Sequence, residues 1–265
     1  MEICICPDAA EVGRMSAALV AKVSREAVGD PVLGVATGSS PLGTYAELAR
    51  LVAAGNLDLT RAYAFALDEY VGLPLGHPQS YAEIIRATVT EPLRMNPARV
   101  RTPNGFAADV EAAATDYERM IAAAGGVDIQ ILGVGSNGHI GFNEPSSSLA
   151  SRTRIKTLTA RTRQDNARFF ASLDNVPRHC LTQGLGTIMD ARNVVLVAVG
   201  EGKAHAVAAV AEGPVSSMMP GSVLQMHRSA TLIIDEAAAS QLQLIDYYRE
   251  VFALKPAWQR FDGPA

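Results

Sequence analysis

Short apolar runs alternate with longer amphipathic segments along the whole chain. The short runs are rich in β-branched residues and predict strands at residues 2–6, 31–36, 62–67, 127–133, 193–199 and 231–235. The longer segments are rich in alanine and leucine and predict helices at residues 9–27, 42–54, 79–90, 108–124, 161–172, 202–212 and 236–253. Strands that alternate with helices favour a mostly parallel sheet with helices on both faces. The sequence therefore predicts an α/β fold.

Composition narrows the class of protein. No repeat, low-complexity tract or linker divides the chain, so a single domain over residues 1–265 is expected. With 48% hydrophobic and 19% charged residues the chain can bury a large core. The formal net charge of −4 provides no basic field for nucleic acid, and no apolar run reaches the roughly 18 residues that a membrane span needs. Cys4, Cys6 and Cys180 form no disulfide framework and the N-terminus has no signal-peptide pattern, so we expect a cytoplasmic protein without a membrane partner.

Polar or glycine-rich residues follow four of the predicted strands. The stretches are TGSSP after 31–36, DEY after 62–67, VGSNGHIGFNEP after 127–133 and GEGK after 193–199. Ligands of open parallel sheets bind beyond the carboxyl ends of the strands. We therefore expect these four stretches to converge on one crevice.

Two of the stretches suit an anion. Thr37, Ser39 and Ser40 offer hydroxyls and Gly38 lets backbone N–H groups approach a ligand, at the start of a predicted helix. The segment lacks the P-loop and dinucleotide patterns, which favours a single phosphate on a small molecule, with an ordinary helix cap as the alternative. Lys203 lies in the first turn of another predicted helix, where a cation is unfavourable unless an anion binds, and a solvated lysine is the alternative.

The other two stretches carry groups that can move protons. Asp68 and Glu69 end a predicted strand, where one carboxylate could be a general base and the other reading is a turn or cap residue. His139 lies five residues before Glu144, and a histidine needs a partner such as Glu144 or Asn137 to fix its tautomer. A zinc site would need a further ligand nearby, so no metal is expected. A histidine with an ordinary structural role in the loop is the alternative.

A basic segment covers residues 151–170. It contains Arg152, Arg154, Lys156, Arg161, Arg163 and Arg168 against a single acid, Asp165. This segment could bind RNA, clamp a phosphate, bind an effector or form a solvated basic helix. It has few aromatic residues for stacking on bases.

Together these motifs resemble the glucosamine-6-phosphate deaminase family, also called glucosamine-6-phosphate isomerases. The resemblance runs from about residue 8 to about residue 252 and rests on TGSSP, LDEYVGLP, SYAEIIR, GSNGHIGFNEP, SLASRTRIKTLT and CLTQGLGT. Phosphogluconolactonases share the fold and a related Gly-His loop, but GFNEP and LDEYVGLP are not expected in them.

The resemblance implies a modified Rossmann-like fold and a reaction without a cofactor. Glucosamine 6-phosphate and water would give fructose 6-phosphate and ammonia, with Asp68 as the base that moves the C2 proton to C1. His139 would carry the proton for ring opening, paired with Glu144. Asn137 stands where some members carry aspartate, so Glu144 is expected to carry more of this relay. The resemblance also implies a mobile lid at about 158–185. The phosphate ligands it implies are Thr37, Gly38, Ser39, Ser40, Arg168 and Lys203.

Regulation is implied only for some members. Hexameric relatives are activated by N-acetylglucosamine 6-phosphate at a subunit interface, whereas monomeric relatives keep most of the same residues. The matching positions here are Ser147, Arg154, Lys156 and Thr157, with Tyr247 as a further one, so a homo-oligomer such as a hexamer is an expectation. A deaminase for galactosamine 6-phosphate and a sugar-phosphate-binding regulator are the alternatives, and the presence of Asp68, His139 and Glu144 argues against the regulator.

Overall fold

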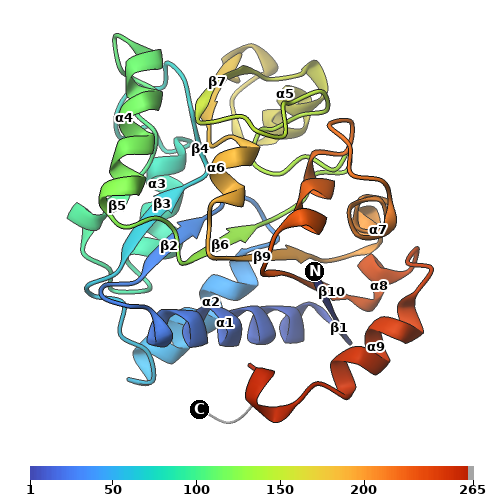
Figure 1. Ribbon diagram of the computed structural model, residues 1–265. Helices are drawn as coiled ribbons and strands as arrows, with labels where there is room; N and C mark the ends of the chain where they lie inside the picture. Colours follow the sequence, from blue (N-terminus) through green and yellow to red (C-terminus); the bar gives the residue numbers. More distant parts are fainter. Residues whose placement is uncertain (262–265) are drawn as a thin grey trace.

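A seven-stranded parallel sheet forms the centre of the molecule (Figure 1). The computed structural model describes residues 1–261, except for the side chains of residues 161, 165 and 169, so Arg161 of the basic segment lies outside the described side chains. The strand order is β1-β10-β9-β6-β2-β3-β5, and every paired strand is parallel to its neighbour. The bounds are β1 Glu2–Cys6, β2 Val32–Val35, β3 Tyr63–Ala66, β5 Val100–Arg101, β6 Ile129–Leu132, β9 Asn193–Ala198 and β10 Ala230–Asp235.

All the predicted strands occur in this sheet, and β5 is the one strand of it that the pattern missed. The chain runs from β2 outwards through β3 to β5, then returns to place β6 on the other side of β2. The strand order therefore reverses between β2 and β6. In open α/β sheets a ligand crevice opens at such a reversal, beyond the carboxyl ends of the strands.

Helices cover both faces of the sheet, as predicted. Side chains of one strand alternate between two cores: Val195 and Val197 pack with α1 and α2, whereas Leu196 packs with α4, α6 and α7. Figure 1 shows α1 and α2 below the sheet and α6 above it. The helices are α1 Ala9–Glu26, α2 Leu42–Ala53, α3 Tyr81–Ile85, α4 Val110–Ala123, α5 Ala160–Asn166, α6 Leu185–Met189, α7 Ala204–Glu212, α8 Glu236–Ala239 and α9 Ile245–Ala253. Within residues 1–261 no helix is long and apolar enough to cross a membrane.

Three predicted helices differ from the observed ones. The helix expected at 79–90 is α3 followed by a π-helix, η1 (Arg86–Thr90), and the helix expected at 161–172 is α5 followed by a 3-10 helix, η3 (Ala167–Phe169). The helix expected at 236–253 is divided into α8 and α9. The carboxylate of Glu212 accepts hydrogen bonds from the backbone N–H groups of Gln243 and Leu244. These bonds fix the chain just before the first residue of α9, so α9 begins as a separate helix.

A small antiparallel sheet stands beside the carboxyl end of β3. It consists of β4 (Asp68–Tyr70), β8 (His179–Thr182) and β7 (Arg154–Thr157), in the order β4-β8-β7. The register places Asp68 opposite Thr182 and Thr182 opposite Arg154. The sequence did not predict this sheet, because its strands DEY, HCLT and RIKT are not apolar runs and β7 lies in the basic segment.

Gly34 lies at the centre of the large sheet, where a larger side chain would not fit. It pairs with Gln130 of β6, whose fully buried side-chain amide fills the space above it and donates to the carbonyl oxygen of Ile131 over 3.0 Å. A Cβ at position 34 would meet Oε1 of Gln130. We expect Gly34→Ala to lower the free energy of unfolding by about 1–3 kcal/mol in urea denaturation, the usual cost of overpacking. Adding Gln130→Ala should recover part of this loss, and an additive double variant would contradict the clash.

Candidate active site

Loops from neighbouring strands meet at the carboxyl edge of the large sheet. The Nζ atom of Lys203, after β9, donates a hydrogen bond to the carbonyl oxygen of Val134, after β6, over 2.8 Å. A Cβ atom added to Gly141 of the β6 loop would lie 3.6 Å from Oδ2 of Asp68, which follows β3. The predicted convergence of the strand ends is confirmed, and it occurs where the strand order reverses.

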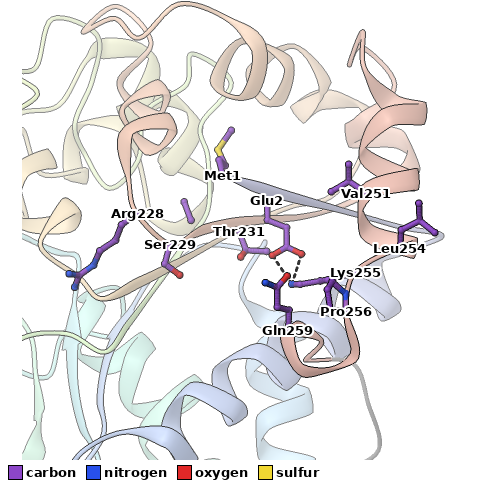
Figure 2. A pocket seen from close by; sticks show the side chains of 11 residues that line it. Met1, Glu2, Arg228, Ser229, Thr231, Val251, Leu254, Lys255, Pro256 and Gln259 are labelled. Atoms are coloured by element: carbon purple, nitrogen blue, oxygen red, sulfur yellow. Dashed lines mark hydrogen bonds and ion pairs between the residues drawn. The ribbon is translucent and has the colours of Figure 1, made fainter.

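A pocket of about 450 Å³ lies elsewhere on the molecule (Figure 2). Its lining includes Glu2 and Thr231, at the amino ends of β1 and β10, and Lys255 after α9. The Nζ atom of Lys255 lies 2.6 Å and 2.8 Å from the two carboxylate oxygens of Glu2, so these charges neutralise each other. Because this pocket is at the opposite ends of the strands from Asp68 and His139, we place the chemistry at the carboxyl edge and not here.

The loop after β2 has the features of an anion site. Gly38 has a φ of 109°, a conformation that favours glycine. The N-cap of α2 is Pro41 and no side chain caps the helix, so the alternative reading of the hydroxyls as an ordinary helix cap is wrong. Ser40 lies against the β6 loop, since a Cβ atom on Gly133 would be 3.7 Å from its Cβ. The Thr37 side chain interacts with the half-buried Tyr81 side chain.

The two predicted phosphate cations occupy different surroundings. Lys203 ends the 3-10 helix η5 (Glu201–Lys203) and points across to the β6 loop through its bond to Val134, so it is not a solvated side chain. Arg168 lies in η3, in the segment between β7 and β8, and is exposed. The structure thus brings Lys203 to the candidate site from the large sheet and leaves Arg168 on a surface segment.

The two adjacent carboxylates at the end of β3 have separate roles. Glu69 accepts hydrogen bonds from the backbone N–H groups of Tyr70, Tyr81 and Ala82, two of which begin α3. Its cap role was one of the two alternatives for this pair, and the geometry assigns it to Glu69. Asp68 is 6% exposed and faces the β6 loop.

Burial makes Asp68 hard to ionise. Desolvation, helped by the nearby charge of Glu69, raises the pKa of Asp68 from its ordinary 3.8 to about 8. A carboxyl group that titrates close to neutrality can take up and return a proton at low cost, as a general base must. Asp68 is therefore the better candidate for proton transfer of the two.

His139, Glu144 and Asn137 form one cluster on the loop after β6. The Nδ1 atom of His139 lies 3.6 Å from Oε1 of Glu144, a distance that fits an ion pair but not a hydrogen bond. The Nδ2 atom of Asn137 donates to Oε2 of Glu144 over 2.6 Å, and the Asn137 carbonyl accepts from the backbone N–H of His139 over 3.3 Å. The Glu144 partner expected for His139 is in place, and Asn137 links the two.

Glu144 is held as an anion. Burial alone would raise its pKa, but His139 and the hydrogen bonds from Thr162 and Asn137 outweigh that effect and lower the pKa of Glu144 to about 2. The cluster can therefore support a charged imidazole without losing its own charge. Among the residues that the structure describes, no group of three or more His, Cys, Asp or Glu side chains is arranged to hold a metal ion.

Two site residues were missed by the sequence reasoning. Thr162 donates its hydroxyl to Oε1 of Glu144 over 2.7 Å, and Thr182 accepts the backbone N–H of Phe142 over 3.1 Å. Thr182 joins the β6 loop to the strand that pairs with Asp68, so it connects the two groups of proton-transfer residues. Thr182 lies in the CLTQGLGT motif, but neither threonine has a local signal for its contact, because both contacts are made across the fold.

The expected effector residues are distributed over two regions. Arg154, Lys156 and Thr157 lie on the edge strand β7, and burial lowers the pKa of Arg154. Ser147 is buried shortly after Glu144, and its hydroxyl has no hydrogen-bond partner. Tyr247 is 57% exposed on α9, which packs against β1, and Figure 1 shows α9 and β7 at opposite sides of the molecule. One copy of the chain does not bring Tyr247 to the other four residues.

Comparison with known proteins decides the family. A family model described as "Glucosamine-6-phosphate isomerases/6-phosphogluconolactonase" matches residues 7–233. The chain belongs to this family. It is 59% identical over 249 residues to the glucosamine-6-phosphate deaminase of Cutibacterium acnes, with 94% of this chain and 95% of the relative covered. It is 56% identical over 259 residues to that of Arthrobacter sp. (strain FB24), with 98% and 99% covered.

Solved structures of the family agree with the fold. A monomeric glucosamine-6-phosphate deaminase is 41% identical and superposes with a TM-score of 0.87, covering 91% of this chain and 100% of that one. A 6-phosphogluconolactonase from Trypanosoma cruzi is 17% identical with a TM-score of 0.72, covering 91% and 97%, and this likeness concerns the fold alone. The resemblance seen in the motifs and the predicted α/β class are confirmed.

The raised pKa of Asp68 predicts a pH-dependent cost in stability. From its ordinary 3.8 up to about 8, the folded protein keeps a proton on Asp68 that the unfolded chain releases. Stability therefore falls as the pH rises through this window. Asp68→Asn removes this titration, so we expect it to raise the melting temperature by several degrees more at about pH 8 than at about pH 5. An equal effect at both pH values would contradict the buried, protonated carboxyl group.

The hydrogen bond between Asn137 and Glu144 predicts the effect of placing an aspartate at position 137. Asn137→Asp would place two carboxylates where the 2.6 Å hydrogen bond now lies. Two carboxylates this close share a proton, which raises the pKa of one of them. We expect the acid limb of the kcat/KM profile to move to higher pH, whereas Asn137→Ala, which adds no charge, should move it less. Superimposable profiles for the two variants would contradict this reading.

Proposed function

We propose that the protein is a glucosamine-6-phosphate deaminase, which converts D-glucosamine 6-phosphate and water into D-fructose 6-phosphate and ammonia without a cofactor. The observation that carries the proposal is that two proton-transfer groups lie on neighbouring loops at the carboxyl edge of the large sheet. Asp68 titrates near neutrality on the β3 side, and the His139–Glu144 pair stands on the β6 loop. The names of the family members at 56% and 59% identity support the same reaction.

The first half of the reaction opens the sugar ring. A proton leaves the O1 hydroxyl and one is delivered to O5, which suits an imidazole. In our proposal His139 carries this proton and Glu144, held anionic, stabilises the charged imidazole. Asn137 holds the carboxylate in place, and its neutral amide leaves Glu144 as the nearby anion.

The second half moves a proton and releases ammonia. Asp68 takes the proton from C2 and returns it to C1 through an enolamine, and water then replaces the amine at C2 as ammonia leaves. The substrate's amino group is a cation at neutral pH, so binding it beside Asp68 would favour the charged carboxylate that the base needs. This compensates for the burial that otherwise keeps the group protonated.

The phosphate group would lie at the β2 loop. We assign Thr37, Gly38, Ser39 and Ser40 to one side of it, since their hydroxyls do not cap α2. We assign Lys203 and Arg168 as the two cations, and propose that the segment carrying Arg168 is a lid. The expected lid at about 158–185 includes β8, whose Cys180, Leu181 and Thr182 are buried between two strands, so we propose the part before it, 158–178, as the moving part.

We also propose that N-acetylglucosamine 6-phosphate activates the enzyme. An anion would satisfy the unpartnered hydroxyl of Ser147 or the half-buried cation of Arg154 on β7. Because Tyr247 lies on the other side of the chain, its participation requires a second copy, as in a hexamer. Sedimentation with and without the effector, together with its influence on the rate curve, tests both points.

Release of ammonia from a panel of amino-sugar phosphates tests the function. We expect turnover of glucosamine 6-phosphate with fructose 6-phosphate as the product. Preference for galactosamine 6-phosphate would support the epimeric alternative, and tight binding without turnover would support the regulator.

Two variants should separate the proton steps. We expect Asp68→Asn to abolish both deamination and the exchange of the C1 proton of fructose 6-phosphate, with a much smaller loss of substrate binding from the missing charge beside the amino group. His139→Gln should slow ring opening, so an analogue that is already open-chain should recover much of a loss of about 10²–10⁴-fold. If the analogue rescued Asp68→Asn and not His139→Gln, the two roles would be reversed.

Lys203→Ala should act through the phosphate. A charge-assisted hydrogen bond contributes about 1.5–3 kcal/mol, so we expect KM for glucosamine 6-phosphate to rise about tenfold or more. The rate with glucosamine, which has no phosphate, should change far less. Equal losses on the two substrates would show that Lys203 does not bind the phosphate.

A further inference from the structure

The hydroxyl of Thr162 donates a hydrogen bond to the oxygen of the Glu144 carboxylate that faces His139. It donates to Oε1 of Glu144 over 2.7 Å, while Nδ1 of His139 lies 3.6 Å from that same oxygen. The other oxygen, Oε2, accepts from Asn137 over 2.6 Å. Nδ1 of His139 is buried and has no hydrogen-bond partner. Neutral donors thus hold both oxygens of Glu144 in place, and Nδ1 of His139 stays beyond hydrogen-bond distance of the carboxylate.

A second threonine fixes the direction of this contact. The Oγ1 atoms of Thr159 and Thr162 are 2.9 Å apart, and Thr159 also accepts the backbone N–H of Thr162 over 3.1 Å. An ionised carboxylate only accepts hydrogen bonds, so the single hydroxyl proton of Thr162 goes to Glu144. The proton between the two threonines therefore comes from Thr159, which leaves Thr162 oriented towards Glu144.

Thr162 belongs to the segment that also carries Arg168. The segment closes at its base through the backbone bond from Leu158 N–H to the Arg178 carbonyl, 2.9 Å long. Its far end rests on β4 and the loop after it, where the ring of Phe170 meets Tyr70 edge-on at 5.7 Å and stacks on His77 at 6.2 Å. One segment therefore contacts the proton relay through Thr162 and presents a cation at Arg168.

We propose that Thr162 is a positioning residue that ties the His139–Glu144 relay to the position of residues 158–178. With the segment as it lies here, Thr162 holds Oε1 of Glu144 and the hydrogen bond between His139 and Glu144 is not formed. When the segment moves, Oε1 is released and accepts the Nδ1 proton of His139, which closes the relay. The inference rests on the proposed function, because it takes the phosphate of the substrate, through Arg168, as the ligand that moves the segment. It adds a reason for the enzyme to open the ring only of a phosphorylated sugar.

The first experiment observes the relay directly. The full chain, labelled with ¹⁵N-histidine, is compared without substrate as wild type, Thr162→Val and Thr162→Ser, and His139→Gln assigns the resonance. We expect a downfield, exchange-protected Nδ1 proton of His139 in Thr162→Val, which no longer holds Oε1 of Glu144 away from Nδ1, but not in the wild type or in Thr162→Ser. Identical His139 resonances in all three proteins would overturn the proposal. Thr162→Ala repeats the test with a smaller side chain if the valine variant is unstable.

The second experiment measures discrimination by the phosphate. The ratio of kcat/KM for glucosamine 6-phosphate to that for glucosamine should fall about tenfold or more in Thr162→Val, since the relay then closes without help from the phosphate. Thr162→Ser should keep the wild-type ratio. An equal loss on both substrates would mean that Thr162 only supports the fold, which also overturns the proposal. A wild-type protein that releases no ammonia would instead refute the proposed function, and the histidine spectra would still decide the contact.

Discussion

Burial of the parallel sheet on both faces is the constraint on which the rest of this structure depends. Strands such as β9 send alternate side chains into two apolar cores, so neither face of the sheet has room for polar chemistry. Charged and hydroxyl groups can gather only beyond the strand ends. The strand order reverses between β2 and β6, and in open α/β sheets ligands bind at such a reversal, beyond the carboxyl ends of the strands.

Three carboxylates at this edge show how environment assigns different roles to the same chemical group. Glu69 is used by three backbone N–H groups around the start of α3. Asp68, its neighbour in sequence, is buried and has a pKa raised to about 8, whereas Glu144 has a pKa lowered to about 2 by its hydrogen-bond donors and His139. Groups whose pKa values are driven apart in this way are suited to act as acid and base in successive steps. The difference comes from the burial, charges and donors around each group and not from the residue type.

The amide of Asn137 matches the hydrogen-bonding groups of both its neighbours. Its carbonyl receives the backbone N–H of His139 and its amide supplies a proton to Glu144, so it needs both ends of an amide. An aspartate at this position could perform the first task but would meet Glu144 with a second negative charge. The charge that supports His139 is therefore concentrated on one carboxylate, and whatever else bonds that carboxylate, such as Thr162, gains influence over the relay.

The sequence by itself determined the large sheet, the helices on its faces and most residues proposed for the candidate site. Periodicity found six strands because each is a continuous apolar run, and the motifs TGSSP, LDEY, GHIGFNEP and GEGK marked the strand ends because ligand loops need glycine and polar residues there. Only the tertiary structure decided the rest. The small sheet of β4, β8 and β7, the capping of α9 by Glu212 and the contacts of Thr162 and Thr182 all join residues distant in the chain. Such contacts leave no local pattern, because a three-residue strand or a lone threonine is ambiguous until the fold supplies its partner.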